Sequence, residues 1–418
     1  MAHKVLIGGT SYNSTGGRSL ITGTGYDIIK GRTLIGGTGY NISFNGGVSG
    51  DDEPAYALFY SDGSLDFQRG DTSNTSKTLS ASYTGFEENT SSYSPWNKVN
   101  LTSVYFLNTI SPLNMANWFN NARNLVSISN IENLDMSNVT NMYNTYSGCG
   151  NLTGNPICGL NVTNMYYTYY GCGNLTGSPV CGPNVTDMGG TYSGCNKLTG
   201  NPVCGDKVTS MASAYKGCNK LIGSPVCGNK VTNMVYTYYG CHNLTGNPVC
   251  GPNVTSMHTA YCECYNLTGS PVCGNNVTVM YQAYLRCNKL TGSPACGPNV
   301  TNMAYAYTNC TNLRGNAYFY SNNVSDVTNC FRGKNNSKRI NIYVTNGSTT
   351  YTKLINTSKK YGLVGNTITW STGGGLGSTI YSYNTAYNIY IYPVDNVAAA
   401  RTANGDDEGD ITHSGGAV

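Results

Sequence analysis

The fold of this 418-residue chain is decided by a stretch near its middle, residues 161–183, which reads NVTNMYYTYYGCGNLTGSPVCGP. Near-copies of this stretch follow one another without insertion between residues 142 and 314, at a period of 23 residues. Four columns of side chains keep the period, namely Met (Met142 to Met303), Tyr (Tyr146 to Tyr307), Cys (Cys149 to Cys310) and Leu (Leu152 to Leu313). Such self-similarity predicts stacked rungs of equal length that bury their apolar side chains against one another.

Each rung is expected to combine a short helix with a short strand. Val162, Met165, Tyr169 and Cys172 are three, four and three residues apart, which is the spacing of one buried helical stripe. The return path carries Pro at the same place in seven rungs, and Pro cannot donate to a sheet ladder. We therefore expect a strand of only three residues, as in 179–181. The predicted fold class is a leucine-rich-repeat-like repeat solenoid with small β-rich N-terminal and C-terminal flanking regions.

A known family shares this pattern. The run NVTNM at 161–165, followed by an aromatic residue, Gly171-Cys172 and NLT at 174–176, resembles the BspA-type bacterial surface-protein repeat over residues 100–355. The resemblance implies a leucine-rich-repeat fold and a role in surface adhesion, or in host binding by phages and prophages of gut Firmicutes. Two departures stand out: Tyr replaces Phe in the buried column, and Pro-Val-Cys replaces a Leu-Asp-Leu strand.

The flanks differ in composition from the rungs and divide the chain into five regions. Residues 1–48 repeat every 14 residues and are expected to form a Gly-rich β-repeat attachment segment, similar to the N-terminal segments of phage tail-associated proteins. Residues 49–112 predict a small β domain or N-terminal cap, and 113–330 the solenoid. Residues 331–397 predict a β-rich C-terminal cap, and 398–418 a flexible acidic tail.

Charge and hydropathy argue against several classes of partner. A net charge of +4 without a basic block does not favour nucleic acid, and no apolar run is long enough to span a membrane. The first residues lack the apolar core of a secretory signal, so we expect synthesis in the host cytoplasm and a place in the virion. The bacterial cell surface is the alternative location.

The 17 cysteines form two main columns. The column from Cys149 to Cys310 lies on the predicted buried stripe and is expected to hold free thiols. The column from Cys158 to Cys296 follows an inward-pointing residue, so strand alternation predicts that it faces outward with accessible thiols. Disulfides between rungs are the alternative for this second column.

Catalytic and metal-binding chemistry is poorly supported. The three acids of the repeats, Asp187, Asp206 and Glu263, belong to different rungs, and the four histidines are scattered and are interpreted as surface substitutions. Cysteine spacing does not match a zinc site, and no Gly-rich stretch matches a phosphate loop. We expect a non-enzymatic protein without cofactor or metal.

Binding is predicted on the positions that vary between rungs. Only 11 residues between 142 and 315 are charged, and Tyr recurs where a drifting solvent face would collect Lys and Glu. The predicted ligand-binding residues are Tyr166, Tyr167, Tyr170, Tyr236 and Tyr239. Their expected partner is a glycan or protein of the bacterial surface, while the N-terminal segment would contact other virion proteins; self-association is left open.

The expected function is that of a phage or prophage structural protein, a tail-associated receptor-binding or adhesion protein. The alternatives are a BspA-type adhesin of the bacterial cell surface and a structural or decoration protein of a virion.

Overall fold

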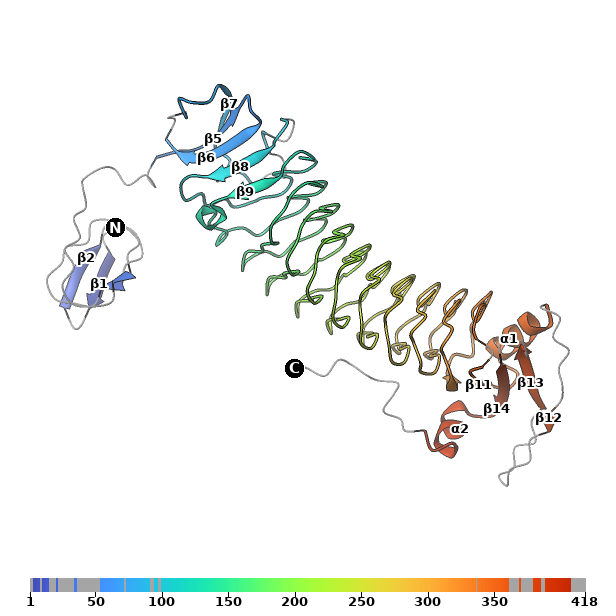
Figure 1. Cartoon of the computed structure of the whole chain (residues 1–418). Coiled ribbons are helices and arrows are strands. Elements are labelled where there is room, and N and C mark those ends of the chain that lie inside the picture. Colours follow the sequence, from blue (N-terminus) through green and yellow to red (C-terminus); the bar gives the residue numbers. More distant parts are fainter. Residues whose placement is uncertain are drawn as a thin grey trace.

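The computed structural model of the chain places a stack of rungs between two five-stranded sheets (Figure 1). It describes residues 53–406 apart from 71–72, 91–93, 97–98, 336, 361–367, 370–378 and 385–387, together with four strands near the N-terminus. These four strands are β1 (His3–Ile7), β2 (Thr10–Ser14), β3 (Leu20–Ile21) and β4 (Leu34–Ile35). Strands β3 and β4 pair in parallel with Leu20 opposite Leu34, so the 14-residue period brings equivalent residues into register.

An N-terminal sheet leads into the stack. Its strands are β5 (Ala55–Tyr60), β6 (Ser64–Arg69), β7 (Leu79–Thr84), β8 (Ser103–Phe106) and β9 (Ser127–Ser129), in the order β7-β5-β6-β8-β9. The first three strands pair antiparallel, whereas β6, β8 and β9 pair in parallel. Beneath the sheet, the ring of Phe67 lies 4.8 to 5.4 Å from those of Phe86, Trp96, Phe106 and Trp118. This aromatic cluster closes one end of the stack, where no further rung could cover the core.

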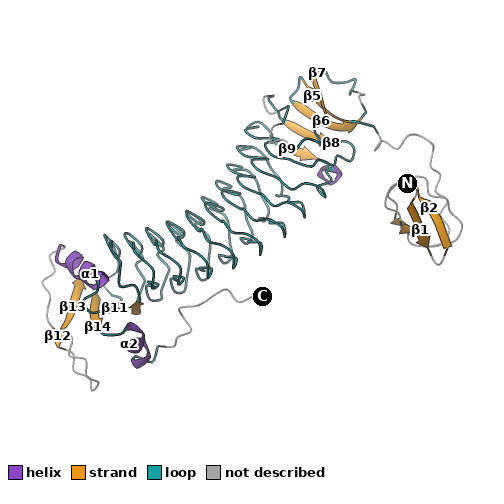
Figure 2. Cartoon of the chain, turned by 180° about the vertical axis from the view of Figure 1, so that it is seen from behind, coloured by secondary structure: helices purple, strands orange, loops and turns teal. Residues whose placement is uncertain are grey.

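The rung stack, residues 139–331, follows a short 3₁₀ helix, η1 (Ile131–Asn133). One isolated bridge joins each rung to the next, through Asn141, Asn164, Asp187, Ser210, Asn233, Ser256, Val279, Asn302 and Asp326. Successive bridged residues are 23 apart, except for the last pair, which is 24 apart. Figure 2 shows the rungs as loops, with strands only toward the two ends of the stack. The sequence period is therefore also the spatial register between rungs.

The predicted helix of each rung is wrong, although its stripe is buried. Val162, Met165, Tyr169 and Cys172 are at most 2% exposed, as the stripe required. Residues 139–331, all of which are described, contain no helix. The inward face that the sequence pattern indicated is therefore built by a different backbone.

That backbone alternates turns within a rung with hydrogen bonds between rungs. The Thr168 N–H closes a turn on the Met165 carbonyl at 3.0 Å, whereas the Tyr167 N–H crosses to the Gly189 carbonyl of the next rung at 2.9 Å. Between Val162 and Cys172, the residues Tyr167 and Gly171 have left-handed φ angles of 55° and 73°. Positive φ is incompatible with a right-handed helix, and here it redirects alternate N–H groups toward the neighbouring rung.

The predicted three-residue strand is also absent, and a tyrosine hydroxyl takes the place of its ladder. The Tyr192 hydroxyl accepts a hydrogen bond from the Val180 N–H at 2.9 Å and donates one to the Val180 carbonyl at 2.7 Å. The same pair of hydrogen bonds joins Tyr169 to Ile157, Tyr215 to Val203, Tyr238 to Val226, Tyr261 to Val249, Tyr284 to Val272 and Tyr307 to Ala295. The tyrosine in the buried column and the Pro-Val-Cys segment are thus one feature, because Phe has no hydroxyl to make hydrogen bonds with the backbone of that segment.

The buried tyrosines also form a continuous column of rings. Their centroids are 5.1 to 5.7 Å apart, from Phe119 at the start to Phe331 at the end. Aromatic stacking and hydroxyl bonding therefore act on the same side chains along the whole core.

Both cysteine columns contact the core, so the expectation that the second faces outward is wrong. In the first column, the Cys172 thiol donates to the Tyr146 carbonyl of the preceding rung at 3.0 Å. In the second, Cys158 packs against the hydrophobic core with its sulfur 3.5 Å from that of Met165, and Cys296 is only 2% exposed. All 17 cysteines are free thiols. Alternation failed as a guide here because the segment is not a strand.

The C-terminal cap continues the stack into a sheet. It comprises β10 (Gly315–Phe319), β11 (Ile340–Thr345), α1 (Thr349–Lys360), β12 (Ile368–Thr369), β13 (Thr379–Asn384), β14 (Ile389–Val394) and α2 (Val397–Ala403), with strand order β10-β11-β14-β13-β12. The first three strands of that order pair in parallel. A bridge from Cys296 to Phe319 links β10 to the preceding rung.

The predicted flexible tail is corrected in its first part. Helix α2 begins after Asn396, whose side chain accepts a hydrogen bond from the Ala399 N–H, and it buries Val397, Ala400 and Arg401. Beyond the helix, Asp406 still contacts β10 through hydrogen bonds from Asn316 and Tyr318. Residues 398–406 are therefore folded, and the remainder of the predicted tail lies outside the described residues.

Candidate functional site

The turns with left-handed residues place some side chains of each rung in the core and others at the surface. Met165, Thr168 and Tyr169 point into the core and are buried, whereas Tyr166 and Tyr167 are half-buried and Tyr170 is 47% exposed. Tyr236 and Tyr239 are half-buried as well, so all five predicted binding residues reach the surface.

Three of the predicted residues, Tyr166, Tyr167 and Tyr170, form a first tyrosine cluster together with Tyr143. The Tyr143 and Tyr166 rings stack at 5.8 Å with an interplanar angle of 5°. The Tyr166 and Tyr167 centroids are 4.2 Å apart, and Tyr167 meets Tyr170 edge-on at 5.0 Å. Four aromatic rings from two adjacent rungs thus make one contiguous surface.

This first cluster lies over a pair of glycines in the next rung. A Cβ atom on Gly189 would lie 2.7 Å from a ring carbon of Tyr166, and one on Gly190 would lie 2.1 Å from a ring carbon of Tyr167. Larger residues at these positions would push the rings away. Tyr166 and Tyr167 therefore serve two purposes, since each presents one part of its ring to solvent and packs another part onto the rung behind.

The other two predicted residues belong to a second aromatic cluster, made of Lys216, Tyr236, Tyr239, His258 and Tyr281. Tyr236 meets Tyr239 edge-on at 6.1 Å, and the Lys216 ammonium lies 5.1 Å and 5.7 Å from these two ring centroids. His258 lies between Tyr236, at 5.3 Å, and Tyr281, at 4.9 Å. A cation placed over a tyrosine face is favourable, so the lysine is part of this surface.

Sequence reasoning missed three members of the second cluster. Lys216, His258 and Tyr281 stand in different rungs, and His258 in particular was interpreted as an isolated surface substitution. The sequence did carry one signal, the position of each residue within its rung. Tyr236 stands two residues after the Met of its rung, and His258 and Tyr281 each stand one residue after theirs. Adjacent rungs are close enough, with buried ring centroids 5.4 and 5.5 Å apart, for side chains at these two positions to contact each other across rungs.

The structure does not join the two clusters into one patch. One rung lies between them, and it carries Gly189, Gly190 and Ser193 at the positions that hold tyrosines in the first cluster. Along the column of buried rings, successive centroids from Tyr169 to Tyr238 are 5.5, 5.7 and 5.6 Å apart, so the rungs that carry the predicted tyrosines of the two clusters are about 17 Å from each other. A ligand that contacts both clusters must therefore be an extended one.

Two tyrosine hydroxyls of this surface have a raised pKa. A hydrogen bond with Tyr167, together with partial burial, raises the pKa of Tyr166 to about 12. The nearby carboxylate of Glu263 raises the pKa of Tyr239, and Glu263 itself pairs with Arg286 at 2.7 Å. Both tyrosines therefore keep their hydroxyl protons as hydrogen-bond donors.

The residues that the structure describes offer little other chemistry. No group of three or more His, Cys, Asp and Glu side chains there could hold a metal ion. No described helix is long and apolar enough to cross a membrane. The three repeat acids lie in separate rungs, and the pairing of Glu263 with Arg286 is that of a surface ion pair.

Comparison with known proteins gives one partial match. A family model described as "Mycoplasma protein of unknown function, DUF285" matches residues 86–204, which include the end of the N-terminal cap and the first rungs of the stack. The match suggests a BspA-like surface-protein family and so agrees with the resemblance in the repeats. No curated protein and no solved structure matches the chain.

Proposed function

We propose that this chain is a non-enzymatic recognition protein of the leucine-rich-repeat-like solenoid class, whose rung stack presents the two aromatic clusters to a glycan or protein on a bacterial surface. The observation that carries the proposal is the surface itself. Tyrosines occupy outward positions in rungs that hold few charges, and they are held in fixed orientations by stacking.

Rigid tyrosines suit this role for a physical reason. A tyrosine offers a large contact area and a hydroxyl while losing little side-chain entropy on binding. Rings fixed by neighbours lose still less, because their order is established before the ligand arrives. The ligand would be recognised by its shape and by hydrogen bonds, and long-range electrostatic attraction would contribute little.

We further propose that a phage or prophage particle carries the protein as a tail-associated attachment component. The resemblance of the repeats supports this placement, and residues 1–48 would supply the contact with other virion proteins. A BspA-type adhesin of the bacterial cell surface is the second candidate, and the partial family match favours it.

The test is adsorption of the purified full chain to gut Firmicutes cells. Tyr170→Ser and Tyr239→Ser, combined in one variant, remove one ring from each cluster and leave the rings over Gly189 and Gly190 in place. The matched control is Leu160→Ser with Ile222→Ser, because these side chains are 73% and 51% exposed and lie outside both clusters.

We expect the tyrosine variant to lose adsorption and the control to keep it, with little change between low and moderate salt. Equal adsorption by both variants, or adsorption abolished by moderate salt, would refute the assignment of the site. Protease treatment of the cells separates a protein ligand from a glycan ligand.

A further inference from the structure

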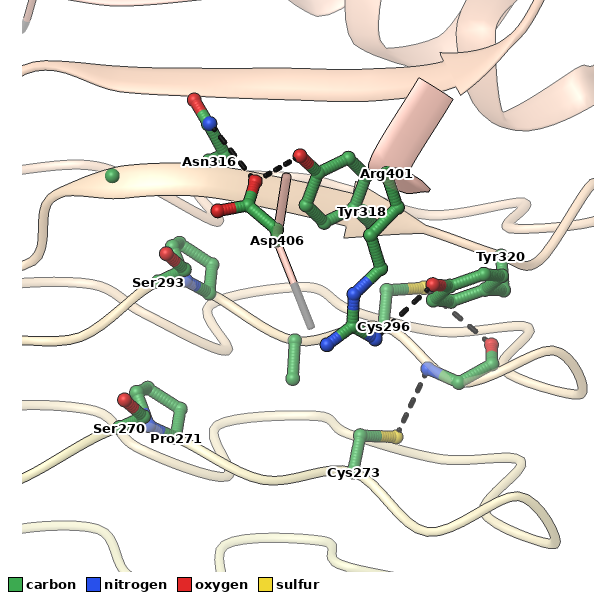
Figure 3. A pocket seen from close by; sticks show the side chains of 14 residues that line it. Ser270, Pro271, Cys273, Ser293, Cys296, Asn316, Tyr318, Tyr320, Arg401 and Asp406 are labelled. Atoms are coloured by element: carbon green, nitrogen blue, oxygen red, sulfur yellow. Dashed lines mark hydrogen bonds between the residues drawn. The ribbon is translucent and has the colours of Figure 1, made fainter. Parts of the chain in front are cut away.

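A second candidate site lies at the far end of the stack, away from the tyrosine clusters. A pocket of about 470 Å³ opens between the last rungs, strand β10 and the C-terminal segment formed by helix α2 and the residues that follow it to Asp406 (Figure 3). Ser293 and Ala295 line it from the rungs, Tyr318 from β10, and Arg401 and Asp406 from the C-terminal segment. Its volume falls in the range of small-ligand sites, roughly 300–1,000 Å³.

The pocket exists because the regular face of the stack changes at this end. In six other rungs the residue between Pro and Cys is Ile or Val, whereas here it is Ala295. The smaller side chain leaves space at the position where α2 covers the face. The backbone of the rung is unchanged, since Ala295 keeps the double hydrogen bond with the Tyr307 hydroxyl.

Polar groups of opposite charge line the pocket. The Arg401 side chain is only 5% exposed, and its guanidinium donates to the Tyr320 hydroxyl at 3.4 Å and lies 5.7 Å from the Tyr318 ring centroid. The Asp406 carboxylate accepts hydrogen bonds from Asn316 at 3.1 Å and from the Tyr318 hydroxyl, both on Oδ2. One carboxylate oxygen is thus held in place, and no residue within the described part of the chain donates a hydrogen bond to Oδ1.

This lining favours a neutral ligand with several hydroxyl groups. One guanidinium and one carboxylate bring no net charge, so a ligand of zero net charge leaves the charge balance of the pocket unchanged, whereas a singly charged ligand adds an excess charge to it. A hydroxyl group can donate to a carboxylate and accept from a guanidinium at the same time. Pro294 and Ala295 add apolar surface for C–H groups.

We propose that this pocket binds a neutral saccharide unit, a mono- or disaccharide or the end of a longer glycan. The Asp406 carboxylate accepts from sugar hydroxyls, Arg401 donates to them, and the Pro294–Ala295 surface contacts the sugar ring. The site is independent of the tyrosine clusters, because none of its lining residues belongs to either.

The experiment is ligand-observed NMR followed by calorimetry on the full chain. The probes are glucose, galactose, N-acetylglucosamine and maltose, with glucuronate as the anionic and alanine as the zwitterionic comparison. Ala295→Val fills the pocket with the residue that other rungs carry at this position, and Asp406→Asn removes the acceptor charge. The control is Ala212→Val, which makes the same change in a rung far from the pocket and introduces a residue present one rung later at Val235.

We expect at least one neutral sugar to bind, with affinity reduced about tenfold or more by Asp406→Asn and by Ala295→Val and unchanged in the control. Ala295→Val keeps the fold of the rung, so it tests the pocket even if Asp406→Asn loosens α2. No binding by any neutral sugar, preference for glucuronate or alanine, or binding that ignores both pocket variants would overturn the proposal.

The variant with Tyr170→Ser and Tyr239→Ser distinguishes this site from the proposed attachment surface. It should keep sugar binding in the pocket while losing adsorption to cells. Sugar binding lost in that variant, yet kept in the two pocket variants, would place the saccharide on the tyrosine surface and refute the pocket.

Discussion

Replacing one buried tyrosine by phenylalanine tests the feature that most distinguishes this stack. In the Tyr215→Phe variant the ring stays between Tyr192 and Tyr238, whose centroids lie 5.7 and 5.6 Å away, so little packing is lost. The hydroxyl is removed. In the native protein, the Tyr215 hydroxyl donates a hydrogen bond to the Val203 carbonyl at 2.7 Å and accepts one from the Val203 N–H at 2.9 Å.

The expected cost follows from those two bonds. A buried polar group left without its partner costs about 1–3 kcal/mol, and two such groups are created. Because Val203 is only partly buried, water can reach some of this backbone and reduce the penalty. We expect the free energy of unfolding to fall by about 2–4 kcal/mol, against about 3–5 kcal/mol for Tyr215→Ala, which also opens a cavity.

The assay is guanidinium denaturation of the full chain, followed by circular dichroism and combined with amide hydrogen exchange. The Val203 amide should exchange faster in the variant even if the unfolding transition has several steps. The control is Tyr236→Phe in the second cluster, which should change stability by less than about 0.5 kcal/mol. Equal effects of the two variants, or unchanged exchange at Val203, would refute the proposed replacement of the sheet ladder by tyrosine hydroxyls.

Three further predictions concern the thiols and the repeat. Burial raises the pKa of every one of the 17 cysteines, for example that of Cys204 to about 12, whereas unfolded thiols titrate near pH 9. A group whose pKa is raised in the folded state stabilises below its unfolded pKa and loses that contribution as pH rises, by up to about 1.4 kcal/mol per pH unit for each thiol. We therefore expect cooperative alkaline unfolding soon above pH 9, and stability that is flat between pH 9 and 11 would contradict this assignment. A thiol reagent at pH 7.5 should modify few cysteines in the native protein and all of them after denaturation; rapid labelling of the column from Cys158 to Cys227 would show that these thiols are accessible after all. Deleting residues 184–206 removes one whole period and should leave a shorter folded stack with a cooperative melt, whereas deleting 184–194 shifts every column and should abolish it; similar melting curves for both deletions would argue against stacked rungs.

The sequence alone was sufficient for the periodicity and for the inward columns. A rung that repeats every 23 residues without insertion can only place equivalent residues above one another, and the buried positions of Met165, Tyr169 and Cys172 follow from that constraint. The predicted tyrosines also reach the surface. These properties depend on which residues recur, and recurrence is written directly in the chain.

Only the tertiary structure showed which partners the backbone N–H and C=O groups bond to. A spacing of three, four and three residues suits a helix, but it equally suits a series of turns with left-handed residues such as Tyr167 and Gly171. The choice depends on hydrogen-bond partners in the neighbouring rung, as between Tyr167 and Gly189, and on the Tyr192 hydroxyl that reaches Val180. No local pattern specifies such partners.

The same reason limits what the sequence could say about the sites. Tyr236 and His258 become one surface only through stacking, and Gly190 matters only because the Tyr167 ring lies on it. The pocket needs Ala295 and Arg401 together, although 106 positions separate them in the chain. A repeat determines its own interior from within one period, but contacts between rungs and caps are properties of the assembled chain.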